Sequence, residues 1–309
     1  MRLLVTGASG FIGRNLLRTI PPTWPVSATY NGSTGFMTFL ERDGLHNVTP
    51  VRVNLTEKGA GRCIAALSTE FDACVYLAAN GDPTRSVENP RFDLDSNAAT
   101  LLEVLKSVRI GRFVHLSSGA VYDGLRGAVS PESRVDPTLP YAVSKLASER
   151  YVRHFERTGS IGSSVIVRFF GAYGRDEPER KIFTRLVRRF ALERDARFVL
   201  RGDGRNLIDA MYVDDAVQAI LAILRDPEMS SLTLDLSGGR PIPLAELVRT
   251  AARAFDLEAE ITTFGGVAEH IEFWSSDSTM ARRYGFAPRI SLEEGLHRLA
   301  AHLTADRDV

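Results

Sequence analysis

The chain has 309 residues, of which 44% are hydrophobic and 25% are charged, and its formal net charge at pH 7 is zero. This composition is typical of a globular protein with one large domain or two modest ones. Without an excess of basic residues there is no electrostatic reason to expect nucleic acid or an anionic membrane surface as a partner. No apolar run approaches the length that spans a bilayer, so we expect no association with a membrane.

Cysteine and histidine usage favours a reducing compartment and argues against a metal centre. The two cysteines, Cys63 and Cys74, lie in apolar surroundings, which predicts two buried free thiols. No cluster of histidine and cysteine has the spacing of metal ligands, so no metal is expected. No signal or transit segment precedes the first strand-like run, and we therefore expect the protein in the cytoplasm.

Strand patterns alternate with helical patterns from residue 2 to about residue 170. Short apolar runs predict buried strands at 3–5, 26–30, 48–53, 73–79, 113–116 and 165–167. Apolar residues at helical spacing predict helices at 11–20, 58–69, 97–108 and 140–158. Elements in this order form a doubly wound parallel sheet with right-handed crossovers.

After residue 170 the segments become shorter, and Gly and Pro interrupt them more often. We therefore expect an α/β fold in which residues 1–170 form a Rossmann, dinucleotide-binding domain. Residues 171–309 are expected to form mainly a smaller, mixed α/β substrate-binding lobe, with some segments returning to the first domain. Doubly wound folds bind ligands at the carboxyl ends of their strands, which is where this lobe should lie.

A glycine-rich turn joins the first predicted strand to the first predicted helix. Gly7, Gly10 and Gly13 have the spacing G-x-x-G-x-x-G. Glycine permits the tight turn and lets backbone N–H groups and the positive helix end approach a pyrophosphate, while the last glycine lets helix and strand pack closely. A strand before and an amphipathic helix after are the context that this motif requires. The turn predicts a bound dinucleotide, NAD or NADP.

The end of the second strand bears on the choice between the two cofactors. An acid at this place binds the ribose 2′-hydroxyl of NAD and repels the 2′-phosphate of NADP. Here the chain continues through Asn31 with no acid, and Arg14, directly after the glycine turn, could reach a 2′-phosphate. This favours NADP, although Asn31 could still bind a ribose hydroxyl.

Tyr141 and Lys145 follow Pro140, which is a favoured first residue of a helix. Side chains four residues apart share one helix face, so phenol and ammonium can enter the same cleft. A free phenol has a pKa of about 10, and a nearby ammonium favours its ionised form. Such a tyrosine can exchange a proton with a substrate hydroxyl. Ser117 and Ser118 end the fifth strand, where a hydroxyl could hydrogen-bond the reacting oxygen.

Together these motifs resemble the extended short-chain dehydrogenase/reductase family, and in particular its NAD(P)-dependent sugar epimerase/dehydratase members. The resemblance spans nearly the whole chain and is carried by Gly7 to Gly13, Leu77-Ala78-Ala79, Asn97, His115 to Tyr122, Tyr141 with Lys145, Arg168 to Gly174, Met211 to Asp215 and Tyr284 to Leu296.

The resemblance implies that Ser118, Tyr141 and Lys145 are the catalytic triad, with Tyr141 as acid and base. It also implies a homodimer formed through the helix of the Tyr-Lys pair and the helix before it. The residues expected to contact the cofactor are Gly7, Gly10, Phe11, Ile12, Gly13, Arg14, Asn31, Asn54, Leu55, Leu77, Ala78, Ala79, Asn97, Ser117, Tyr141, Lys145 and Phe169.

Two departures from the family pattern narrow the reaction and the substrate. Dehydratases of the family carry Asp-Glu after the active-site Ser or Thr, where this chain has Gly119-Ala120. Elimination is therefore disfavoured. Many members have Asn at Gly171 and Arg at Ile208, where they hold a nucleotide diphosphate. The candidate substrate contacts here are Arg85, Ser118, Gly171 and Arg205, and Arg201 or Arg180 could replace the missing arginine in place of Arg205.

Three functions remain open. The first is an epimerase of a sugar, expected to be nucleotide-activated, that works through a transient ketone with Tyr141 as acid and base. The second is an NADP(H)-dependent ketoreductase or dehydrogenase of a sugar or another carbonyl compound. The third is a non-enzymatic dinucleotide-sensing scaffold, against which the Tyr141–Lys145 pair argues.

Overall fold

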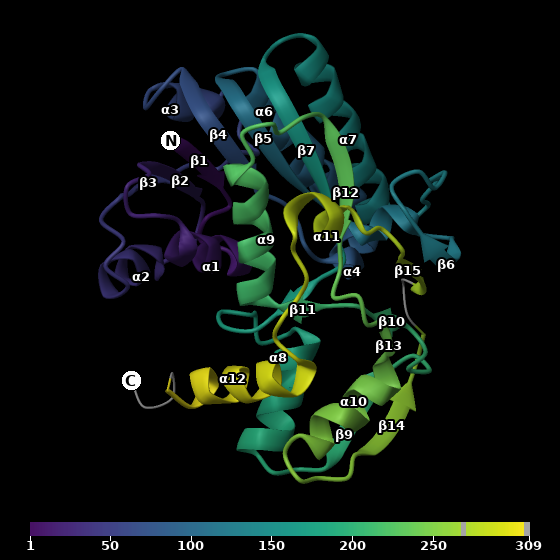
Figure 1. Cartoon of the computed structure of the whole chain (residues 1–309). Helices are drawn as coiled ribbons and strands as arrows, with labels where there is room; N and C mark the ends of the chain where they lie inside the picture. Colours follow the sequence, from purple (N-terminus) through teal and green to yellow (C-terminus); the bar gives the residue numbers. More distant parts are fainter. Residues whose placement is uncertain (267–269, 306–309) are drawn as a thin grey trace.

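The computed structural model describes residues 1–266 and 270–305. Its larger part is a seven-stranded parallel sheet with the order β12-β7-β5-β4-β1-β2-β3 (Figure 1). From β1 the chain builds the sheet first in one direction, through β2 and β3, and then in the other, through β4 and β5. The point between β1 and β4 is where doubly wound sheets bind ligands. The strands are β1 (Leu3–Thr6), β2 (Val26–Tyr30), β3 (Val48–Arg52), β4 (Glu70–Tyr76), β5 (Arg109–Ser118), β7 (Ile161–Phe169) and β12 (Leu232–Leu236).

The strands are buried because both faces of the sheet are covered. Leu3, Leu4 and Val5 of β1 are fully buried, and they alternate between two hydrophobic clusters on opposite faces. One cluster includes side chains of α1 (Phe11–Thr19), α2 (Phe36–Arg42) and α9 (Val213–Arg225). The other includes side chains of α3 (Gly61–Ala65), α6 (Thr100–Leu105) and α7 (Pro140–Arg157). This three-layer packing explains the continuous apolar runs in the sequence.

A smaller lobe lies at one end of the sheet, in the lower part of Figure 1. Its helices are α8 (Ile182–Val187), continued by a π-helical turn (Arg188–Leu192), α10 (Leu244–Arg253) and α12 (Leu292–Ala305). Its strands pair as β9 (Arg197–Arg201) with β14 (Glu260–Phe264), and β10 (Leu207–Ile208) with β13 (Ile242–Pro243).

Shorter elements connect the two parts. Two further strand pairs are β8 (Ala172–Tyr173) with β11 (Met211–Tyr212), and β6 (Arg126–Val129) with β15 (Glu272–Ser275). Three short helices are α4 (Pro83–Glu88), α5 (Pro90–Leu94) and α11 (Thr279–Tyr284). A 3₁₀ turn (Gly119–Tyr122) follows β5. Among the described helices, none is both long and apolar enough to cross a bilayer.

The expected α/β fold is confirmed, and several predicted elements change in length. The strand expected at 73–79 begins at Glu70 and ends at Tyr76, so its last three residues lie in the following loop. The helix expected at 58–69 is limited to α3, because Gly59 has a φ of 82° that no helix accommodates. The helix expected at 97–108 is divided into a π-helical turn (Asp95–Ala99) and α6.

Two elements beyond residue 170 lie with the sheet. β12 pairs in parallel with β7, and α9 packs against α1. The division at residue 170 stays a prediction. The expectation of two buried thiols is wrong for Cys63, which is exposed on the short helix α3, whereas Cys74 in β4 is buried.

Candidate active site

A cavity of about 430 Å³ lies at the carboxyl ends of the strands, between the sheet and the smaller lobe. Ser117 and Ser118 enter it from the end of β5, and Tyr141 and Lys145 enter it from the first turns of α7. The opposite wall comes from the loop after β8 and from the segment around β10, with Glu177, Pro178, Arg180, Lys181, Leu207 and Asp209.

A second cavity of about 320 Å³ adjoins the first and shares Leu77 and Ala79 with it. The loops after β1, β2, β3 and β4 line it, because parallel strands end at the same edge of the sheet. Of the residues expected to bind the cofactor, this cavity is lined by Gly7, Gly10, Asn31, Asn54, Leu55, Leu77, Ala78 and Ala79. The first cavity is lined by Phe11, Ile12, Leu77, Ala79, Ser117, Tyr141, Lys145 and Phe169.

The glycine turn has the shape needed to approach a pyrophosphate. Gly7 has a φ of 65°, and a Cβ there would lie 2.8 Å from the backbone nitrogen of Ala78. Gly13 does not line either cavity; its missing Cβ lets α1 pack on Ala8, whose carbonyl oxygen would lie 2.6 Å away. Within the described part of the chain no side chain caps the first N–H groups of α1, so these groups can bind an anion. These features fit a dinucleotide.

Lys145 is buried, and its ammonium donates a hydrogen bond of 2.6 Å to the carbonyl oxygen of Leu116. Burial lowers the pKa of Lys145 to about 8, while the carboxylates of Glu149 and Asp93 act in the opposite direction. The ammonium is thus held at the end of β5, where it faces the cavity beside the predicted acid and base.

Ser118 and Tyr141 approach the cavity from two elements. The hydroxyl oxygen of Ser118 accepts the backbone N–H of Ala120 at 3.1 Å and so caps the 3₁₀ turn after β5. Among the described residues its hydroxyl hydrogen has no recorded acceptor, so it can donate to a substrate oxygen. The backbone N–H of Tyr141 donates to Ser86 Oγ at 3.1 Å, which fixes the start of α7 against α4.

Asn97 lines neither cavity. It is buried, and its Oδ1 accepts the backbone N–H of Asn80 at 2.8 Å. Its Nδ2 donates to Ser144 Oγ at 2.8 Å and to Asp93 Oδ1 at 3.0 Å. Asn97 therefore ties the loop after β4 to α7, the helix of the Tyr-Lys pair. The geometry assigns it a positioning role, where the resemblance implied a cofactor contact.

A buried polar network that sequence reasoning did not find lies behind Ser117. The hydroxyl of Ser117 donates to Glu149 Oε1 at 2.6 Å, and Arg168 is ion-paired with Glu149 at 2.9 Å. The guanidinium of Arg168 also donates to the Tyr122 hydroxyl at 3.1 Å, and that hydroxyl donates to Asp235 at 2.7 Å. The network thus joins the end of β5 to β12, which a local sequence pattern cannot indicate.

The four predicted substrate contacts separate into two pairs. Ser118 and Gly171 line the first cavity. Arg85 and Arg205 are absent from its described lining: the guanidinium of Arg85 stacks on the ring of Phe92 at 3.7 Å, and Arg205 is exposed beside Asp203. Neither arginine contributes to the described wall of this cavity, and their contact with the substrate stays a prediction.

The cations that do line the cavity are Arg180 and Lys181. Arg180 is ion-paired with Asp82 at 3.5 Å, and Lys181 Nζ donates to the carbonyl oxygen of Gly81 at 3.4 Å. Both contacts join the loop after β8 to the loop after β4 across the cavity. The adjacent Glu-Arg-Lys run after Pro178, in a loop that follows a buried strand, was the available sequence signal.

Two buried carboxyl groups on the same wall, Glu177 and Asp209, also went unnoticed. Burial raises the pKa of Glu177 to about 7, although Thr184 donates two hydrogen bonds to its Oε2. Burial likewise raises the pKa of Asp209, whose Oδ1 accepts the backbone N–H of Arg240 at 3.0 Å. Carboxyl groups in such positions can accept hydrogen bonds from sugar hydroxyls. Among the described residues no cluster suits a metal ion.

The sheet order, the glycine turn and the adjoining cavities define a dinucleotide-binding α/β protein. A model of the NAD dependent epimerase/dehydratase family matches residues 3–232. The chain belongs to this family, and the resemblance to extended short-chain dehydrogenase/reductases is confirmed.

Individual relatives match nearly the whole length of the chain. It is 26% identical to an uncharacterized UDP-glucose epimerase, YtcB, of Bacillus subtilis, over 99% of this chain and 98% of that protein. It is 29% identical to a dTDP-glucose 4,6-dehydratase of Streptomyces niveus, over 96% of this chain and 90% of that protein. The crystal structure of a Bacillus cereus UDP-glucuronic acid 4-epimerase, in complex with UDP-glucuronic acid and NAD, has a TM-score of 0.87 at 21% identity, over 99% of each chain. That structure shares the fold.

Proposed function

We propose that the protein is an NAD(P)-dependent epimerase that inverts a carbinol carbon of a nucleotide-activated sugar through a transient ketone. The observation that carries this proposal is that Ser118, Tyr141 and Lys145 line one cavity, which adjoins the cavity at the glycine turn. Family membership and the names of the relatives, among them a UDP-glucose epimerase, support it.

The three side chains have separate tasks in this reaction. The chemistry that a nicotinamide supplies when bound is reversible hydride transfer at the carbinol carbon. Tyr141 removes the proton of the substrate hydroxyl and later returns it. Ser118 donates a hydrogen bond to the same oxygen, and the nearby ammonium of Lys145 favours the ionised form of the phenol. Inversion would require both faces of the ketone to be presented in turn to the same side of the cavity, so the sugar would have to turn within it.

The wall beside Ser118 argues against dehydration. Elimination needs an acid that protonates the leaving hydroxyl, and the two residues after Ser118 are Gly119 and Ala120. A Cβ on Gly119 would lie 3.2 Å from the ring of Phe170, so this position is packed as a glycine. The similarity to dTDP-glucose dehydratases therefore does not extend to the acid that their reaction requires.

The substrate's diphosphate is assigned to Arg180 and Lys181. They are the arginine and the lysine that enter the described lining from the lobe side, opposite the catalytic side chains. A guanidinium and an ammonium can both bind phosphate oxygens. They would replace the arginine that many family members carry where this chain has Ile208.

The experiment for this proposal starts with the cofactor. Purified protein is denatured, and the dinucleotide that it releases is identified by mass spectrometry. A dinucleotide at one per chain agrees with an internally recycling epimerase, and UDP- and dTDP-sugars are then tested for isomerisation by NMR. Isomerisation that disappears in Tyr141→Phe supports the proposal. Full isomerisation by Tyr141→Phe contradicts it.

A ketoreductase or dehydrogenase that exchanges NADP(H) with solvent is the second candidate, favoured by the absence of an acid at residues 29–35. It predicts protein that is purified without dinucleotide and that oxidises NADPH when a carbonyl substrate is added. A non-enzymatic sensor would bind a dinucleotide and show neither activity.

The proposed assembly is a homodimer through α7 and the helical stretch before it, which runs from α5 through the π-helical turn to α6, with α4 packed beside them. These helices pack together, and they expose large apolar side chains that a second copy could cover, namely Val87, Leu94, Val143 and Tyr151. Light scattering at twice the monomer mass would support the dimer, and a monomer at all concentrations would exclude it. The proposed location stays the cytoplasm, in keeping with the free thiols of Cys63 and Cys74.

A further inference from the structure

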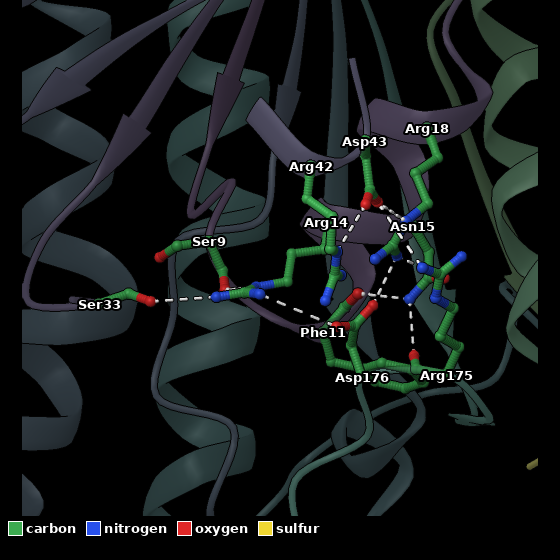
Figure 2. A network of polar contacts seen from close by, with 10 residues as sticks. All are labelled: Ser9, Phe11, Arg14, Asn15, Arg18, Ser33, Arg42, Asp43, Arg175 and Asp176. Carbon is green, nitrogen blue, oxygen red and sulfur yellow. Dashed lines mark hydrogen bonds and ion pairs between the residues drawn. The ribbon is translucent and has the colours of Figure 1, made fainter. Parts of the chain in front are cut away.

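A cluster of arginines lies beside the second cavity, between α1, α2 and the loop after β8 (Figure 2). Arg18 forms ion pairs with both Asp43 and Asp176, Arg42 forms one with Asp43 at 2.9 Å, and Arg175 lies 3.8 Å from Asp43. This network holds the start of the loop after β8 against the end of α2.

Arg14 stands apart from the other arginines of the cluster. Figure 2 shows its guanidinium extending away from Arg18 and Arg175, to a place between Ser9 and Ser33. Its Nε donates to the carbonyl oxygen of Ser9 at 3.0 Å, and its NH2 donates to Ser33 Oγ at 3.3 Å. The guanidinium therefore bridges the glycine turn and the loop after β2.

These two loops are the walls of the second cavity on its β2 side. Ser9 lines the cavity, and so do Asn31 and Gly32, which directly precede Ser33. The ribose that carries the adenine of a dinucleotide lies at the end of the second strand in a doubly wound sheet. Arg14 and Ser33 are not part of the described lining, but their hydrogen bond joins the two walls beside the place where the 2′ position of that ribose is expected.

The cluster holds more positive than negative charge. Among the described residues, the ion pairs of Arg14, Arg18 and Arg175 are with two carboxylates, Asp43 and Asp176, and the Arg14 guanidinium is 3.9 Å from Asp176 Oδ1. Burial lowers the pKa of Arg14; Asp176 and Asp43 act in the opposite direction, and repulsion from Arg18 and Arg42 adds to the lowering. An anion beside Arg14 would relieve this repulsion.

The cluster also has more hydrogen-bond donors than acceptors. Only two of the five N–H hydrogens of Arg14 have a recorded acceptor among the described residues. Arg18 NH2 and Arg175 Nε are buried without any. A phosphate group supplies acceptor oxygens and charge together, and it matches the planar fork of an arginine.

We infer that Arg14 and Ser33 form a site for the 2′-phosphate of NADP(H), so that this chain prefers NADP(H) to NAD(H). The inference rests on the proposed function, because it concerns the cofactor of the same active site. The family description and the Bacillus cereus structure name NAD, whereas the residues beside the second cavity favour NADP(H) in this chain.

The test compares two small probes that differ only in this phosphate. Any bound dinucleotide is removed from the full chain on charcoal and identified by mass spectrometry. Adenosine 2′,5′-bisphosphate and adenosine 5′-monophosphate are then titrated by calorimetry. We expect NADP as the released dinucleotide and at least tenfold tighter binding of the bisphosphate.

Substitutions locate the effect at the two residues. In Arg14→Gln the preference for the bisphosphate should fall to about twofold or less, with little change in the affinity for the monophosphate. Ser33→Asp should do the same, because a carboxylate there would pair with Arg14 and repel the phosphate. Arg14→Lys should keep part of the preference, since it keeps the charge and loses the fork. Arg157→Gln, at the exposed end of α7, is the matched control and should behave as the wild type.

The outcomes separate this inference from the proposed function. Release of NAD, or equal affinities for the two probes, overturns the 2′-phosphate site and leaves the epimerase proposal in place. A preference that persists in both Arg14→Gln and Ser33→Asp also overturns it. If neither probe binds, and neither NAD nor NADP binds, the proposed function is overturned together with the inference.

Discussion

Lys145 and Leu116 are joined by a hydrogen bond of 2.6 Å from the ammonium to the carbonyl oxygen, in a place where the lysine is almost fully buried. Burial of a charged amine costs free energy, and it lowers the pKa of Lys145 to about 8, from about 10.4 for an exposed lysine. The strand end therefore holds a destabilised charge beside the predicted acid and base. This relationship leads to a prediction in which stability and activity change in opposite directions.

Lys145→Met should abolish most activity and stabilise the fold. We expect kcat to fall by about 10²–10⁴, the range for loss of a group that supports general acid–base catalysis. At pH 7 the free energy of unfolding should rise by up to about 3 kcal/mol, because the penalty for a buried charge disappears. Circular dichroism in urea measures the second effect.

The stability difference between the wild type and Lys145→Met should depend on pH. The folded pKa of Lys145 is lower than its unfolded pKa. As pH rises from about 8 towards the unfolded value, the buried lysine becomes neutral, the cost of its buried charge disappears and the free energy of unfolding of the wild type rises. The stability difference between wild type and Lys145→Met should accordingly shrink between pH 8 and pH 10. A difference that is constant over this range would show that the burial of charge is not its cause.

Asp235 should make the protein less stable at alkaline pH. Burial raises its pKa to about 7, so the folded state binds the proton more tightly than the unfolded chain. Its contribution to stability is fully present below the unfolded pKa of about 3.9 and is lost as pH rises through 7. In Asp235→Asn, which can still accept a hydrogen bond from Tyr122, this loss between pH 5 and pH 8 should be largely absent. Thermal unfolding in that range measures it, and identical pH profiles for the two proteins would refute the assignment.

The sequence predicted those parts of the fold and the site that local patterns encode. The strands β1 and β2 and the helix α7 follow from runs of neighbouring apolar residues, and the glycine turn follows from spacing and context. Tyr141 and Lys145 line one cavity because four residues make about one helical turn. Ser118 joins them because it ends a parallel strand at the same edge of the sheet.

Features that depend on distant contacts were outside the reach of the sequence. β12 joins the sheet by pairing with β7, about 70 residues earlier in the chain. The sequence of its five residues does not indicate which strand they pair with. Arg180 lines the cavity while Arg85 stacks on Phe92, although both are arginines in loops or short helices near strand ends. Only the path of each loop decides which cation faces the cavity.

Asn97 should matter for stability and leave dinucleotide affinity nearly unchanged. Asn97→Ala would leave the buried backbone N–H of Asn80 without its acceptor, and an unpaired buried group costs about 1–3 kcal/mol. We expect a lower melting temperature, with a Kd for NAD or NADP within about threefold of the wild type, since Asn97 lines neither cavity. A Kd raised tenfold with unchanged stability would instead support the cofactor contact that the resemblance implied.

Arg180 and Lys181 should determine the affinity for the substrate. Arg180→Gln and Lys181→Gln should each raise KM for an active UDP- or dTDP-sugar by about tenfold, close to the worth of one charged hydrogen bond, with little change in kcat. Arg85→Gln is the matched control, because this arginine stacks on Phe92 outside the cavity and should leave KM within about twofold.

Asp82→Asn should have the opposite effect to Arg180→Gln. Asp82 competes with a substrate phosphate for the guanidinium of Arg180, which lies 3.5 Å from its carboxylate. Asparagine removes the charge and keeps the side-chain oxygen that caps α4 at Thr84 and Arg85, so the loop should stay in place. KM should fall by about two- to fivefold at low ionic strength, and the difference should diminish with added salt because ionic strength screens exposed pairs. A raised KM in Asp82→Asn would mean that the ion pair orders the binding loop, and the role of Arg180 would then be to hold Asp82 in place of the substrate.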